Sequence, residues 1–139
     1  MNTKQVIVMR TVFPDGKGGT MGIRKGKSVA QGSHASMAFL TNGARGGFLR
    51  FIFNCMKVWF HRPSRAWLRS SYAKVCVRVD SEAELQEIYS KAIQEGLTAH
   101  IIVDSGRTEF GGIPTATAVA IGPDECGRID KITASLELY

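Results

Sequence analysis

The sequence predicts an α/β domain in which a small sheet carries helices on both faces. Short runs rich in β-branched residues alternate with longer segments of helical periodicity, and several helical segments are bounded by capping residues. The order of predicted elements is β, α, α, β, α, β, β, α, which is typical of such a layered arrangement. The chain has 139 residues, 44% of them apolar, and can bury one core, so residues 1–139 are expected to form a single domain.

A glycine-rich loop separates the first predicted strand from the first predicted helix. Residues 5–11 (QVIVMRT) form a β-rich run, and the loop after it continues to Gly26. A helical pattern then extends from Ser28 to Leu40. Asn42 and Gly43 form its expected C-terminal cap.

Residues 48–61 predict a second helix with two unlike sides. Its large apolar residues share one broad side, and Arg50, Asn54, Lys57 and His61 recur at intervals of four, three and four on the other. This pattern favours an amphipathic helix that covers the core with its polar side in water, over a helix that lies on a membrane surface.

Pro63 is expected to end the second helix. The basic segment after it is interpreted as a connector, in which Trp67 and Tyr72 seal the core rather than offer a stacking surface for bases.

The second half of the chain has clearer boundaries. Residues 74–79 alternate valine with other residues, as in a strand near a sheet edge. Ser81 and Glu84 have capping-box spacing for a helix that ends before Gly96. Residues 99–104 and 116–122 predict two further strands, and Pro123 with the two acids after it is expected to begin the last helix.

The composition excludes several classes of protein. Three cysteines, widely separated and without metal or redox spacing, argue against a disulfide scaffold and favour a reducing, cytoplasmic setting. The apolar N-terminal run is too short for a secretion signal, and the longest apolar cluster is interrupted by Arg50, Asn54 and Lys57. No membrane partner is therefore expected.

The positive charge of the chain is concentrated in one segment. Residues 16–79 contain twelve of the eighteen lysines and arginines and no aspartate or glutamate. A surface of one sign favours a polyanionic partner, because binding to phosphates releases counterions. A basic surface that only maintains solubility is the alternative.

Two places in the sequence carry groups suited to chemistry. Lys27, Gln31 and His34 are spaced four and three apart, so they share one face of the first helix. A lysine at a helix start opposes the helix dipole unless an anion lies there. Taken singly, each of the three residues has an ordinary structural explanation.

The second place is the segment 101–110 (IIVDSGRTEF). Asp104 ends a buried strand, where open α/β sheets hold ligand-binding groups, and a glycine-bearing turn with Arg107 and Thr108 follows it. The alternative is that Asp104 only pairs with Arg107 or caps the turn.

A nucleotide-binding P-loop is a further alternative for the same two places. The tripeptide GKS before a helix and an aspartate at a strand end imitate its motifs. Met21, however, stands where the motif needs its first glycine.

Five segments occur together in an informative order: QVIVMRT, RKGKSVAQGSHASMAF, DSGRTEF, AIGP and IDKITASLELY. In that order they resemble the type 2 peptidyl-tRNA hydrolases, the class familiar from archaea and eukaryotes. The resemblance covers nearly the whole chain and is weakest from Thr41 to Tyr72. It implies a three-layer α/β/α sandwich with a mixed four-stranded sheet, and hydrolysis of the ester that joins a peptide to tRNA, without metal or cofactor.

The resemblance also implies the site residues. The implied catalytic residues are Lys27, His34, Asp104 and Thr108, and the implied substrate-binding residues are Gln31, Ser33, Gly106 and Arg107. Three features depart from the family pattern: Gly32 in place of a frequent cysteine, Ser105 in place of the usual alanine, and the loop after Glu109. The basic aromatic segment 57–72 is also unusual.

Ester hydrolysis needs an oriented water, a proton acceptor and donors for the developing oxyanion. The hypothesis is that Asp104, with His34, orients or deprotonates the water, while Lys27 and Thr108 donate to the oxyanion or the ribose oxygen. Gln31 is assigned to positioning the substrate.

Cations of the basic segment are expected to hold the tRNA phosphates by shape and charge. These residues are Arg24, Lys25, Arg45, Arg50, Lys57, Arg62, Arg65 and Arg69. The rival hypothesis is a non-catalytic RNA-binding or adaptor protein on the same fold. The apolar residues between Phe48 and Trp67 would also permit a homodimer.

Overall fold

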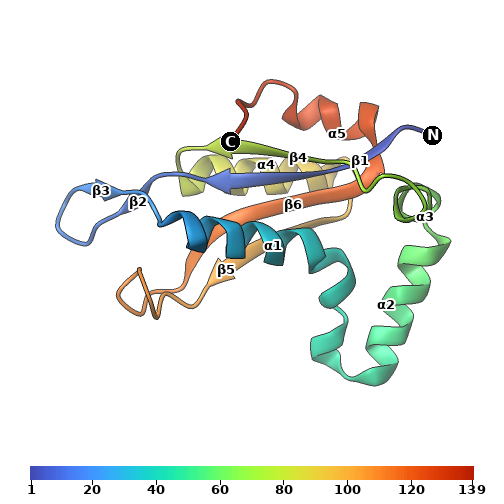
Figure 1. Ribbon diagram of the computed structural model, residues 1–139, viewed down its shortest axis with the longest axis horizontal. Helices are drawn as coiled ribbons and strands as arrows, with labels where there is room; N and C mark the ends of the chain where they lie inside the picture. The colour runs from blue at the N-terminus through green and yellow to red at the C-terminus, as the bar shows by residue number, and fades with distance from the viewer.

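The computed structural model describes residues 1–139 and contains a mixed four-stranded sheet in the order β4-β1-β6-β5 (Figure 1). The strands are β1 (Thr3–Arg10), β4 (Lys74–Val79), β5 (Ala99–Asp104) and β6 (Thr115–Glu125). Strand β1 runs parallel to β4 and antiparallel to β6, and β5 runs antiparallel to β6. The predicted fold class and the edge position of β4 are confirmed. A small ribbon, β2 (Phe13–Pro14) with β3 (Thr20–Met21), precedes the first helix.

Helices cover both faces of the sheet. Helix α1 (Lys25–Thr41) packs on one face, and α4 (Glu82–Gln94) and α5 (Cys126–Thr133) pack on the other (Figure 1). Alternation along β1 sends Val6 and Val8 into the larger core with Leu85, while Ile7 and Met9 point toward α1. The small side chains on the α1 side let that helix lie close to the strands.

Two predicted helix boundaries were wrong. Helix α1 begins at Lys25, three residues before Ser28. Strand β6 continues through Pro123 to Glu125, and α5 begins only at Cys126. The late start of α5 has a tertiary cause, because pairing with β1 keeps the chain extended through Asp124 and Glu125.

The segment after Pro63 is a helix and not a connector. Helix α3 (Arg62–Leu68) begins with Pro63 in its first turn, where proline suits helical geometry. Trp67 is buried, its ring meets Phe39 edge to face at 5.7 Å, and its indole N–H donates to the Ala73 carbonyl. Trp67 therefore seals the core as predicted, whereas Tyr72 is exposed beside it.

Helix α2 (Phe48–Phe60), which follows the short 3-10 helix η1 (Ala44–Gly46), has no buried residue. The Asn54 amide donates to the carbonyls of Phe39 and Leu40 at 3.0 Å, so a polar residue faces the last turn of α1. The large apolar residues lie on the exposed side instead. The prediction of an apolar face laid on the core was wrong, whereas Arg50 and Lys57 of the polar side are exposed as expected.

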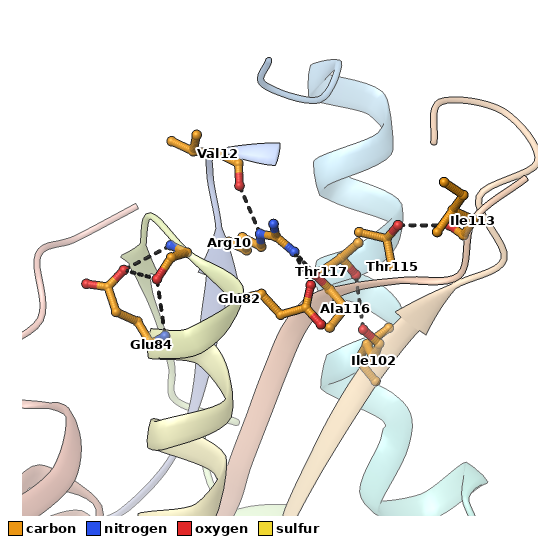
Figure 2. A network of polar contacts seen from close by, with 10 residues as sticks. Arg10, Val12, Glu82, Glu84, Ile102, Ile113, Thr115, Ala116 and Thr117 are labelled. Atoms are coloured by element: carbon orange, nitrogen blue, oxygen red, sulfur yellow. Dashed lines mark hydrogen bonds and ion pairs between the residues drawn. The ribbon is translucent and has the colours of Figure 1, made fainter. Parts of the chain in front are cut away.

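Arg10 fastens the carboxyl end of β1. Its guanidinium is buried, donates to the Val12 carbonyl at 2.8 Å and pairs with Glu82 at 2.8 Å (Figure 2). A longer contact of 3.3 Å reaches the Ala116 carbonyl on β6. Arg10 thus ties β1, β6 and the first turn of α4 together.

None of the helices has both the length and the apolar character needed to cross a bilayer.

Leu85→Ala should lower the free energy of unfolding by about 2–5 kcal/mol, because Leu85 is fully buried in the larger core and its loss leaves a cavity. Gln86→Ala, one residue along on the exposed side of α4, should change it by less than about 0.5 kcal/mol. Urea denaturation of both variants measures the difference. Equal losses in the two variants would contradict this assignment of the core.

Candidate active site

The two places singled out in the sequence meet at one edge of the sheet. Strands β1, β4 and β5 run in the same direction, so their carboxyl ends share that edge, and Asp104 is the last residue of β5. Helix α1 begins at the same end of the molecule (Figure 1). Open α/β sheets bind their ligands at such an edge.

Asp104 accepts three hydrogen bonds that fix its carboxylate. Lys27 Nζ lies 2.6 Å from Oδ2, and Gln31 Nε2 donates to the same oxygen at 2.9 Å. The backbone N–H of Gly106 donates to Oδ1 at 2.9 Å. Only 16% of the Lys27 side chain and 10% of the Asp104 side chain are exposed, so this ion pair is well shielded from solvent.

These contacts keep Asp104 ionised. Burial alone would raise the pKa of the Asp104 carboxyl, but the hydrogen bonds from Lys27, Gly106 and Gln31, together with the positive charge of Lys27, outweigh it. The pKa therefore lies below its ordinary value of 3.8. At neutral pH the site holds a carboxylate and an ammonium in contact.

The ion pair also explains the cation at the start of α1. The first turn of α1 contains no acidic residue, and Arg24 at its N-cap makes no side-chain capping bond. Lysines there oppose the positive end of the helix dipole. Asp104 supplies the missing negative charge for Lys27 from another element of the chain.

The loop after β5 depends on a glycine. Gly106 has a φ of +76°, and a Cβ at this position would lie 2.2 Å from the Ile113 carbonyl oxygen. Its carbonyl accepts from the N–H groups of Phe110 and Gly112, which folds the loop back. Thr108 is thereby brought to Lys27, with Nζ 3.0 Å from its Oγ1.

Thr117 belongs to the same network, although nothing in the sequence analysis selected it. The pairing of β5 with β6 shifts between Ile102 and Val103, so Thr117 is an extra residue in β6. This bulge turns the buried Thr117 hydroxyl toward α1, where it lies 2.6 Å from Gln31 Oε1. It also lies 3.3 Å from the Ile102 carbonyl (Figure 2). Because the hydroxyl engages the Gln31 oxygen, the amide nitrogen of Gln31 is directed at Asp104.

Thr108 reaches the carboxylate only through Lys27, and three other predicted site residues lie outside this hydrogen-bonded network. His34 is exposed, and no hydrogen bond or ion pair joins it to Asp104. Ser33 is exposed and donates to the Val29 carbonyl within α1. Arg107 is exposed on the loop beside Thr108.

The predicted tRNA-binding cations divide into two groups. Arg24 and Lys25 lie at the start of α1, where Arg24 pairs with Glu109 at 2.6 Å. The others lie on or beside η1, α2 and α3, at the other end of α1 (Figure 1). Since α1 has 17 residues, the two groups are separated by about 25 Å.

An apolar pocket of about 470 Å³ lies on a different side of α1 from Asp104. Its lining residues include Ser28 and Gly32 from α1, Met9 from β1 and Cys76 from β4. Tyr139 also lines it and donates a hydrogen bond to Ser28. In the described residues, 1–139, no cluster of three or more histidine, cysteine, aspartate or glutamate side chains is arranged to hold a metal ion.

Comparison with known proteins identifies the family. The family model described as "Peptidyl-tRNA hydrolase PTH2" matches residues 3–139. The chain belongs to the PTH2 family of peptidyl-tRNA hydrolases. It is 40% identical to a peptidyl-tRNA hydrolase of Methanocaldococcus jannaschii over 97% of this chain and 98% of that protein.

Two other relatives agree with this assignment. A peptidyl-tRNA hydrolase of Aeropyrum pernix is 39% identical over 98% of this chain and 95% of its own length. Peptidyl-tRNA hydrolase 2 of Saccharomyces cerevisiae is 31% identical over 86% of this chain and 53% of its own. The family suggested by the motifs, including KGKSVAQGSHA and DSGRT, is confirmed.

Lys27→Met should raise the pKa of Asp104, because it removes the ammonium and leaves burial less opposed. An NMR titration that follows the Asp104 side-chain carboxyl carbon measures the shift. Lys25→Met, on the same turn of α1, is the matched control and should leave the pKa unchanged. An Asp104 pKa that stays equally low in Lys27→Met would contradict this description of the ion pair.

The lowered pKa of Asp104 makes the stability of the fold depend on pH. Since the pKa of Asp104 is lower in the folded protein than in the unfolded chain, the ion pair stabilises the fold above the ordinary value of 3.8, and this stabilisation is lost as the pH falls through the folded value. Asp104→Asn should remove that part of the acid dependence of unfolding.

Proposed function

We propose that this protein hydrolyses the ester bond between the peptide and the terminal ribose of peptidyl-tRNA, and that Lys27, Asp104 and Thr108 are at its reacting centre. Free tRNA and a free peptide are the products, and the tRNA returns to translation. The main observation that supports these residues is that the Lys27 ammonium contacts both Asp104 and Thr108 at the sheet edge. The family of the chain supplies the substrate class.

We propose that Asp104 orients the attacking water. A carboxylate has about four lone-pair positions, and the three donors at Asp104 leave one on Oδ1. A water bound there would donate one of its protons to the carboxylate and would be aimed by it. Because the pKa of Asp104 is lowered, the carboxylate is a weak base, so it orients the water more effectively than it deprotonates it.

His34 is the proposed proton acceptor. It shares the α1 face of Lys27 and Gln31, and its exposed imidazole is not occupied by Asp104. As the water oxygen bonds to the ester carbonyl carbon, its other proton passes to the imidazole. The bond to the ribose oxygen then breaks, and that oxygen takes up the proton.

Lys27 and Thr108 are placed to stabilise the developing negative charge. Two of the three N–H bonds of the ammonium point at Asp104 and Thr108, which leaves one for the oxyanion or the ribose oxygen. Thr108 Oγ1 accepts from Lys27, so its own proton is free to donate to the substrate.

Gln31 and Thr117 are proposed as positioning residues. Gln31 is 3% exposed, and both ends of its amide are occupied by Asp104 and Thr117. This favours a role in holding the carboxylate, in place of the direct substrate contact expected from the sequence. Gly106 has the same role through its N–H. Ser33 and Arg107 are proposed to meet the substrate at the rim.

The cations of η1, α2 and α3 are proposed to bind the tRNA at a distance from the ester. A separation of about 25 Å along α1 is suited to phosphates farther along an RNA helix than the reacting end. Arg24 and Lys25 would hold phosphates nearer the ester.

We propose that residues 1–139 act as one domain in the cytoplasm. A family match over nearly the whole chain supports the single domain. The cysteines Cys55, Cys76 and Cys126 are all free, which supports a reducing compartment.

Lys27→Met and Asp104→Asn should each reduce peptide release from labelled peptidyl-tRNA by about 100-fold or more, because each removes a group from the reacting centre. Thr117→Val should reduce it by about tenfold to 100-fold through misplacement of Gln31, and Thr117→Ser should recover most of the loss. Glu87→Gln and Lys91→Met, both exposed on α4 on the other face of the sheet, are the controls.

Binding of the tRNA must be measured on the same samples. Tight tRNA binding without any peptide release by the unaltered protein would establish the non-catalytic adaptor instead.

The affinity for tRNA should fall steeply as salt increases, since neutralised phosphates release their counterions. Replacing Arg62 and Arg69 by glutamine should weaken binding and reduce the slope of log affinity against log salt by about one for each phosphate that the variant no longer neutralises. Lys91→Gln and Lys131→Gln provide a control of equal charge change on the other side of the sheet. A salt-independent affinity would contradict the proposed tRNA surface.

A further inference from the structure

Helix α2 exposes a continuous apolar face that the hydrolase reaction does not use. Seven large side chains lie within an arc of about 140° on a helical projection, and each is between 40% and 76% exposed. They are Phe48, Leu49, Ile52, Phe53, Met56, Trp59 and Phe60. Soluble proteins rarely leave so many adjacent large apolar side chains in water, so this face indicates a binding surface.

The attachment of α2 fixes this face outward. Asn54 bonds to the carbonyls at the end of α1, and the neighbouring side of α2 packs toward η1 and α3. Figure 1 shows α2 standing away from the body of the domain. The helix cannot turn its apolar face to the sheet without breaking the Asn54 bonds, so its partner must come from outside.

The charges around this face all have one sign. Arg50 and Lys57 flank it on α2, and Arg45, Arg62 and Arg65 lie on the adjacent helices. No aspartate or glutamate occurs between residues 16 and 79. The partner therefore combines an apolar interior with a negative surface.

This combination discriminates among the possible partners. In a symmetric dimer the same cations would face one another across the interface, which is unfavourable. A nucleic acid would satisfy the cations but not the leucine, isoleucine and methionine of the apolar face, which have no stacking role. An anionic bilayer satisfies both, with acyl chains for the apolar face and headgroups for the cations.

We propose that α2 is an interfacial helix that binds the surface of an anionic phospholipid bilayer. It would lie in the plane of the headgroups along its length of about 20 Å, with Trp59 at the boundary between headgroups and acyl chains. The sequence alone predicts no membrane partner, because it predicts that the apolar face of this helix packs on the core. The active site, at the opposite end of α1, stays open to solvent in this arrangement.

Fluorescence and sedimentation with lipid vesicles test this proposal. The chain has two tryptophans: Trp67 is 3% exposed and Trp59 is 51% exposed, so a blue shift on vesicle addition reports on Trp59. Vesicles made of equal parts phosphatidylcholine and phosphatidylglycerol should bind the protein and shift the emission. Vesicles of phosphatidylcholine alone should bind it at least about tenfold more weakly.

Paired variants separate the apolar from the charged contribution. Phe53→Ser with Phe60→Ser should reduce vesicle binding by about tenfold or more, and Arg50→Glu with Lys57→Glu should remove the preference for anionic lipid. The controls are Ile93→Ser with Leu138→Ser, which are exposed apolar residues outside α2, and Lys91→Glu with Lys131→Glu. The phenylalanine pair should leave tRNA affinity unchanged, which distinguishes lipid binding from tRNA binding through the same cations.

Two results would overturn the proposal. One is vesicle binding that the phenylalanine pair does not reduce. The other is no binding to the anionic vesicles. A dimer in sedimentation velocity that the phenylalanine pair dissociates would then assign the face to a second copy.

Discussion

The contact between Lys27 and Asp104 is the interaction on which the site depends. It joins the first turn of a helix to the end of a strand that is more than seventy residues away in the chain. Each group alone would be unfavourable, since the lysine opposes the helix dipole and the carboxylate is nearly buried. Together they neutralise one another, and the free N–H of the ammonium and the free lone pair of the carboxylate remain for a substrate and a water.

Several backbone features serve to hold this pair in place. The bulge in β6 turns Thr117 toward Gln31, and Gln31 in turn fixes one oxygen of Asp104. Gly106 supplies an N–H to the other oxygen in a conformation that a side chain would prevent. The polar network is satisfied from four elements, so it restricts the carboxylate to one orientation.

Local rules predicted the parts of the fold that depend on local physics. The alternating valines of residues 74–79 identified the edge strand. The spacing of Ser81 and Glu84 identified a capping box, and both hydrogen bonds of that box are present in the structure. The helical spacing of Lys27 and Gln31 placed them on one face, and family motifs linked that face to Asp104 before any distance was known.

Tertiary contacts decided the features that the sequence could not predict. Thr117 lies in the run ATAVAIG, which reads as an ordinary strand, because a bulge depends on the register with β5. Pro123 and the acids after it are typical of a helix start, but pairing with β1 kept them extended. The direction of the apolar face of α2 depended on Asn54, whose partners lie at the end of α1.

A double-mutant cycle on Lys27 and Asp104 tests the central claim most directly. Single-turnover cleavage of peptidyl-tRNA would be measured for the unaltered protein, Lys27→Met, Asp104→Asn and the double variant. If the two residues act as one catalytic unit, the double variant should be little slower than the slower single variant. Two rate losses that multiply in the double variant would contradict the account.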